Sequence, residues 1–293
     1  MKPMRLTSSG LAAASIAIFG LAALFCSTAG AQTKTPIRVG ILSGAVPRSA
    51  PFYQAFDRAL TELGYVEGRN LVVEFRNADG QAERLPGLAA ELVRLKLDVL
   101  IAPGSEPTLR AAKQATGTTP IVVVAIDYDP IALGYIAGLA RPGGNVTGLF
   151  LRQLELTTKR IELLKDAIPK IGRIAALWDT FSADQLKEAE GAARAFDVQV
   201  QALRVQNPQP DFEDAFRLAR KGRADAMLVL MSPIFFRDRK HIIDLANKNR
   251  LATISGGSDF AEAGALITYG ANLIDMFRRA AMYVDKILKG AKP

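Results

Sequence analysis

Residues 37–75 read IRVGILSGAVPRSAPFYQAFDRALTELGYVEGRNLVVEF, and this stretch decides the fold. Residues 37–42 and 71–75 are short, mainly apolar runs, whereas residues 50–63 place apolar side chains at helical spacing. Apolar strands that alternate with helices are typical of a parallel sheet covered on both faces. Because crossovers between such strands are right-handed, the stretch predicts a doubly wound α/β unit.

The same alternation continues along the chain and restarts at residue 173. The first half is predicted to add strands at 98–101 and 121–124 and helices at 85–95 and 108–115. The second half is predicted to hold strands at 174–178, 198–203, 226–230 and 252–254, helices at 183–196, 212–221 and 239–247, an extended piece at 266–270 and a closing helix at 274–288. Turn formers at residues 141–148 separate the halves, so two similar α/β units joined by a hinge are expected.

The N-terminus has the pattern of a secretory signal peptide. Lys2 and Arg5 precede an uncharged apolar run at residues 11–25, which is short for a membrane span, and Ala29-Gly30-Ala31 supplies the small residues of a cleavage site. We therefore expect residues 1–31 to be removed after Ala31 and the mature protein to be periplasmic. A lipoprotein anchored through Cys26 is the competing interpretation, although a large residue precedes that cysteine.

Composition excludes several classes of protein. Cys26 is the only cysteine, so a chain cleaved after Ala31 contains no disulfide and depends on its apolar core. The formal net charge is +8, but the basic residues are dispersed and acidic residues interrupt their clusters, as at residues 237–240. No nucleic-acid partner is therefore expected.

Motifs for catalysis and for cofactors are absent from the sequence. It has no G-x-S-x-G, no G-x-x-x-x-G-K-[ST] and no helix-opening G-x-G-x-x-G. The single histidine, His241, is expected on the surface of a helix, and a transition-metal cluster is not expected. Neither an all-carboxylate calcium site nor a pair of catalytic carboxylates distant in sequence has positive support. We predict no enzyme activity, no cofactor and no metal.

Small polar residues follow the strands of the first half, where open parallel sheets bind ligands. Ser43 and Gly44 follow the first strand, and Ser105 and Glu106 follow the third. Free amide donors at the helix that starts after Ser105 would attract a ligand carboxylate. Ser105 can equally serve as the N-cap of that helix, and the two roles are compatible.

Acidic and hydroxyl side chains follow other strands in both halves. Asp129, and less strongly Asp127, follows the fourth strand and could pair with a ligand amine, although Asp before Pro is also a common turn former. In the second half, Asp179, Thr180 and Ser232 occupy equivalent positions. These residues are candidate ligand contacts.

The remaining candidates lie farther along the chain. Ser258 follows the strand at 252–254 but is favoured as the cap of a short helix. Phe150 and Tyr269 are aromatic candidates for the cleft wall, whereas Trp178 is favoured as a packing residue.

A series of stretches in this chain resembles the ABC transporter substrate-binding proteins that include the tryptophan- and tyrosine-type members. The matching stretches, which span nearly all of the mature chain in the family's order, are GYVEGRN (64–70), EFRNADG (74–80), LAAELVRLKLD (88–98), DP (129–130), LARPGGNVTG (139–148), KRIELL (159–164), LANKNRL (245–251), TYGAN (268–272) and RRAAMYVDKILKGAKP (278–293).

The resemblance implies a type I periplasmic binding protein with two Rossmann-like lobes and a ligand held between them. Lobe 1 would comprise residues 36–146 plus 271–293, and lobe 2 residues 147–270, with crossovers near Thr147 and Tyr269. Relatives with known ligands tend to bind aromatic amino acids. Two departures are expected to matter: Glu106 would repel a ligand carboxylate, and the family's final strand beyond Pro293 is not in this sequence, which would leave a sheet edge open in lobe 2.

The sequence therefore predicts the extracytoplasmic solute-binding subunit of an ABC importer. It would act as a monomer, capture a small polar ligand such as an amino acid or related metabolite by hinge closure, and dock on a membrane permease. The alternatives are a sensory ligand-binding protein for a membrane receptor and an exported α/β enzyme acting on a small metabolite.

Overall fold

The stretch at residues 37–75 forms strand β1 (Ile37–Ser43), helix α1 (Pro51–Glu62) and strand β2 (Leu71–Asn77), as its pattern predicts. Pro51 occupies the first turn of α1, where its missing N–H costs no hydrogen bond. Gly64 follows the helix with φ +94°, a conformation that glycine adopts without steric cost, and so allows the chain to turn back. The two strands pair in parallel with Ile37 opposite Leu71.

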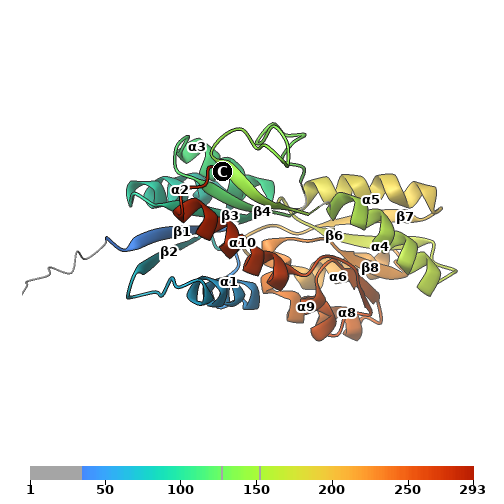
Figure 1. Ribbon diagram of the computed structural model, residues 1–293. Helices are drawn as coiled ribbons and strands as arrows, with labels where there is room; N and C mark the ends of the chain where they lie inside the picture. The colour runs from blue at the N-terminus through green and yellow to red at the C-terminus, as the bar shows by residue number, and fades with distance from the viewer. Residues whose placement is uncertain (1–34, 127, 152) are drawn as a thin grey trace, which may run out of the picture. The chain divides into compact units, whose positions relative to one another are not determined.

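The computed structural model describes residues 35–126, 128–151 and 153–293, and residues 36–293 form one compact unit (Figure 1). The predicted signal peptide with Cys26, and the weaker candidate Asp127, lie outside the described residues. No helix in the described ranges is long and apolar enough to cross a membrane.

The first sheet is parallel, with the strand order β2-β1-β3-β4-β5. Its further elements are β3 (Val99–Gly104), β4 (Ile121–Ala125), β5 (Val146–Phe150), the 3₁₀ turn η1 (Ala82–Arg84), α2 (Leu85–Arg94) and α3 (Glu106–Ala115). Alternate strand residues point to opposite faces: Leu100 and Ala102 join the apolar cluster under α2 and α3, whereas Val99 and Ile101 pack under α1 and α10 (Leu273–Leu288). Both faces are thus covered by helices, as in a doubly wound sheet.

The second sheet is also parallel, with the order β10-β9-β8-β6-β7. Its elements are α4 (Gln153–Ala167), β6 (Arg173–Trp178), α5 (Ala183–Ala195), β7 (Gln199–Arg204), α6 (Phe212–Lys221), β8 (Ala226–Val229), α7 (Pro233–Arg237), α8 (Arg239–Lys248), β9 (Ala252–Ser255), α9 (Ser258–Glu262) and β10 (Ile267–Thr268). Ile174 and Ala176 pack under α4 and α5, whereas Ala175 and Leu177 pack under α6 and α8. The predicted fold class, two α/β units with parallel sheets, is confirmed.

The chain passes between the sheets at two places. Val146–Phe150, which overlaps the predicted boundary at residues 141–148, is a strand that pairs with β4 of the first sheet, so residues 147–150 lie there and not in the second sheet. After β10, the chain leaves the second sheet and α10 packs against α1. The division into lobes at residues 146/147 and 270/271 therefore stays a prediction. The hydrogen bonds of β5 assign that strand to the first sheet.

A buried arginine fixes the start of the second sheet to its end. Arg160 of α4 is 1% exposed, and its Nε donates to the carbonyl of Tyr269, just after β10, at 2.8 Å. Its Nη1 also donates to Thr157 Oγ1 at 3.3 Å. Because a buried guanidinium needs polar partners, this bond holds the returning segment against α4.

Glycine at position 148 is required by the pairing of β5 with β4. Gly148 has φ +143°, and a Cβ there would lie 2.0 Å from the carbonyl oxygen of Val123. We expect Gly148→Ala to lower the free energy of unfolding by about 3 kcal/mol, because the two strands must separate to admit the methyl group. Urea denaturation measures the change. Gly117→Ala is the matched control, since its Cβ would meet nothing within 4 Å; equal effects of the two substitutions would contradict the close approach.

Candidate functional site

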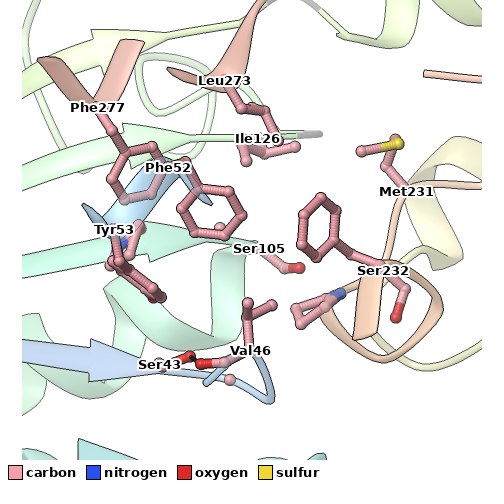
Figure 2. A pocket seen from close by; sticks show the side chains of 15 residues that line it. Ser43, Val46, Phe52, Tyr53, Ser105, Ile126, Met231, Ser232, Leu273 and Phe277 are labelled. Atoms are coloured by element: carbon pink, nitrogen blue, oxygen red, sulfur yellow. Dashed lines mark hydrogen bonds between the residues drawn. The ribbon is translucent and has the colours of Figure 1, made fainter. Parts of the chain in front are cut away.

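A pocket lies where segments that follow strands of both sheets meet. Its cavity volume is about 50 Å³, and it opens to solvent. The first sheet and its helices supply Ser43, Gly44, Val46, Phe52, Tyr53, Pro103, Gly104, Ser105, Ile126, Leu273 and Phe277, and the second supplies Met231, Ser232, Pro233 and Phe236. Figure 2 shows Ser105 between the aromatic side chains of α1 and α10 and the pair Met231 and Ser232.

Aromatic rings make up one wall of the pocket. Phe52 lies 4.5 Å from Phe277 and 5.1 Å from Phe236 between ring centroids, so it contacts both α10 and α7. Tyr53 packs edge-on against Phe277 at 5.2 Å. The N-terminus of α1 positions Phe52 and Tyr53, and α10 reaches them from the far end of the sequence. Among the described lining residues none carries a formal charge, which suits an apolar part of a ligand.

The pocket's hydroxyl groups come from Ser43, Tyr53, Ser105 and Ser232. Ser43 donates to the carbonyl of Val46 at 2.7 Å. Burial raises the pKa of Tyr53 above its usual range, so this phenol is neutral. The Ser105 side chain forms no capping hydrogen bond with α3, although Ser105 is the N-cap residue.

Asp179 lies beneath this pocket and does not line it. Its side chain is fully buried and accepts hydrogen bonds from Ser232 Oγ at 2.5 Å, Asn207 Nδ2 at 3.1 Å, the backbone N–H of Phe181 at 2.9 Å and Ser182 Oγ at 3.1 Å. Burial raises the pKa of Asp179, and the four donors oppose that shift. Asp179 reaches the pocket only through its bond to Ser232, and its contact with a ligand stays a prediction.

Glu106 and Thr180 line a second, more polar pocket, together with Arg110 and Tyr128, and Ile126 lines both pockets. The Glu106 carboxylate accepts a hydrogen bond from the Tyr135 hydroxyl and pairs with Arg110 at 3.4 Å. The acidic group expected to repel a ligand carboxylate is therefore held outside the main pocket.

The other predicted residues do not line either pocket. Asp129 accepts hydrogen bonds from the backbone N–H groups of Ile131 and Ala132, so its turn-forming role is the one observed. Ser258 is exposed at the start of α9, Phe150 packs half-buried against the core, and Tyr269 is 39% exposed.

Sequence reasoning placed Ser43, Gly44, Ser105 and Ser232 at this pocket but did not single out Phe52, Phe236 or Phe277. For Phe52 a local signal existed, because it starts the helix after the first strand. For Phe277 there was no local signal, because this residue reaches the pocket only when α10 packs against α1.

Carboxylates and histidine form no metal site in the part of the chain that the structure describes: no group of three or more metal-ligating side chains occurs there. His241 lies on the exposed side of α8, as predicted, with its Nε2 3.2 Å from Glu213 Oε1.

Comparison with known proteins connects this architecture to transport. The sequence profile of the family described as ABC transporter substrate binding protein matches residues 45–293. The chain belongs to this family. Its members are extracytoplasmic binding proteins, not enzymes, so the rival prediction of an exported enzyme was wrong. The two parallel sheets are those of the type I periplasmic binding protein fold.

Individual relatives agree with the family. A tyrosine-binding protein of Clostridioides difficile (strain R20291) is 25% identical over 240 residues, which are 81% of this chain and 68% of that protein. Among solved structures, a conserved domain protein from Vibrio cholerae has a TM-score of 0.77 at 22% identity, covering 88% of this chain and 87% of that one. An ABC domain in complex with L-Trp from Streptococcus pneumoniae has a TM-score of 0.74 at 21% identity, with the same coverage.

The raised pKa of Asp179 predicts how stability depends on pH in this substrate-binding protein. A carboxyl group whose pKa is higher in the folded state binds its proton more tightly there than in the unfolded state. Stability is therefore lost as pH rises from about 4, the unfolded value, through the folded pKa. We therefore compare the free energy of unfolding of the wild-type protein with that of the Asp179→Asn variant. The wild-type value minus the variant value should fall as pH rises from about 4 to the folded pKa of Asp179, and then stay constant.

Urea denaturation of both proteins between pH 4 and pH 8 measures this difference. Asp129→Asn, at a half-buried turn aspartate, controls for the generic effect of the substitution. A difference that grows with pH would show instead that the four donors outweigh burial.

Proposed function

We propose that this substrate-binding protein captures a small molecule with an aromatic or branched apolar body and delivers it to an ABC permease. The observation that carries the proposal is the pocket itself, which is lined by residues of both sheets and closed on one side by Phe52, Phe236 and Phe277. A ligand seated there would contact segments of both halves at once.

Aromatic amino acids and their close analogues are the first candidates. The wall of rings suits an aromatic side chain, since offset and edge-to-face ring contacts add roughly 0.5–1.5 kcal/mol each to area burial. The relatives described as tyrosine-binding and as complexed with L-Trp support this class. The N-terminus of α3 at Ser105 offers amide donors to a carboxylate, whereas the uncharged lining argues for an apolar remainder.

Hinge closure is the proposed mode of capture. Ser43 and Ser105 lie at the ends of strands in the first sheet, and Ser232 follows β8 of the second, so a ligand that bonds to both sets favours the closed arrangement. Micromolar affinity requires about 8 kcal/mol. Hydrogen bonds of about 1 kcal/mol each and burial of an aromatic body supply this amount once the cost of ordering is met.

The cellular setting follows from the N-terminus and from the family. We propose export through the signal peptide, cleavage after Ala31 and a periplasmic monomer that docks on a membrane permease in its closed form. The dispersed charge of the surface supports the absence of a nucleic-acid partner.

Calorimetry with L-tryptophan, L-tyrosine and L-phenylalanine tests the capture of aromatic ligands. We expect at least one of them to bind, raise the melting temperature and compact the protein in solution scattering. Phe277→Leu should weaken that binding about tenfold, because a ring contact is lost while most of the apolar volume stays.

Leu266→Ala is the control, at a side chain 62% exposed and outside the pocket. Mass spectrometry of molecules that co-purify with the protein extends the search beyond amino acids. A protein that binds no small aromatic compound and carries none from its host would refute the proposed ligand class.

A further inference from the structure

Two serines that face the pocket from different sheets share one bonding pattern. Ser43 Oγ donates its proton to the Val46 carbonyl at 2.7 Å, and Ser232 Oγ donates to Asp179 Oδ2 at 2.5 Å. A carbonyl oxygen cannot donate, and neither can an ionised carboxylate. Both serine protons therefore point into the protein and away from the pocket.

The Ser232 hydroxyl also receives one hydrogen bond from the protein. Ser232 Oγ accepts from the backbone N–H of Ile234 at 3.2 Å. A hydroxyl offers one proton and two lone pairs, so at least one lone pair on each serine is left to accept from a ligand. The two serines can accept from a ligand but cannot donate to it.

The surroundings of Asp179 determine that the Ser232 hydroxyl donates its proton towards the protein and not towards the pocket. Its carboxylate receives four donors and has no charged partner among the interactions that shift its pKa. One of them, the backbone N–H of Phe181, is a donor that cannot reverse its direction. Above its raised pKa the ionised carboxylate is an acceptor only, and Ser232 then donates to it.

We propose that Ser43 and Ser232 form an acceptor pair that selects ligands carrying an N–H or O–H donor beside the apolar body. Asp179 is the positioning residue that sets the direction of the Ser232 hydroxyl. This inference deepens the proposed function and rests on it. It restricts the ligand to amides, amines, phenols and similar donors, and it disfavours ethers and tertiary amides of the same shape.

Asp179→Asn is the decisive variant. It replaces one carboxylate oxygen, an acceptor, with an amide nitrogen that donates, and it changes the shape of the side chain little. An asparagine amide nitrogen at the Oδ2 position donates to Ser232 Oγ, which frees the serine proton for the pocket. The same nitrogen would face Asn207 Nδ2, but rotation of the Asn207 amide replaces that donor with Oδ1, a buried atom that has no partner among the described residues. The variant is therefore expected to fold.

The experiment compares matched probes by ligand-observed NMR titration: phenol against anisole, and benzamide against N,N-dimethylbenzamide. We expect the wild-type protein to bind the donor member of each pair threefold to tenfold more tightly, the effect of one hydrogen bond. Ser232→Ala should reduce the ratio towards one. Asp179→Asn should reduce it further or invert it, an outcome that steric exclusion of the added methyl groups cannot produce.

Ser43→Ala provides a second test that is independent of the fold of the Asp179 variant, and it should also reduce the ratio. Ser258→Ala, at an exposed serine outside the pocket, should leave it unchanged. If both members of each pair bind equally to the wild type, the acceptor pair is refuted while capture of aromatic bodies stands. If the preference survives Asp179→Asn and Ser232→Ala, the role of Asp179 is refuted. If no probe binds, both this inference and the proposed ligand class fail.

Discussion

Parallel pairing of the strands is the constraint on which the whole structure depends. When every strand of a sheet runs in the same direction, all of their carboxyl ends meet at one edge, and the residues that follow them gather there. In this chain β1, β3 and β4 deliver Ser43, Ser105 and Ile126 to one edge, and β8 delivers Met231 and Ser232 to another. The pocket exists because these two edges meet.

The periodic parts of this fold could be predicted from the sequence because their signals are local. Apolar runs at residues 37–42 and 226–230 are strands for reasons contained in the runs themselves. Strand β5 could not be found in this way. Its residues include turn formers, and it becomes a strand because Gly148 permits contact with the backbone of Val123, a relation between segments distant in sequence.

The sequence located some of the residues that line the pocket and misplaced others, for one physical reason. A serine just after a strand lies at the sheet edge whatever the rest of the chain does, so Ser43, Ser105 and Ser232 could be located. Whether a carboxylate in such a position faces a ligand depends on nearby donors. Asp179 turned inward because four of them meet it, and Asp129 turned to the backbone of its own loop. The donors that surround Asp179 and Asp129 cannot be predicted from the residues next to them in the sequence.

The bond between Arg160 and the carbonyl of Tyr269 has a mechanical consequence. It ties the chain's exit from the second sheet to α4, where the chain enters that sheet, so Tyr269 is held to the body of the second half. Torsional freedom is then left to the few residues before α10 begins at Leu273. Motion between the halves would be a pivot at short joints, and little of a ligand's binding energy would be dissipated in bending the sheets.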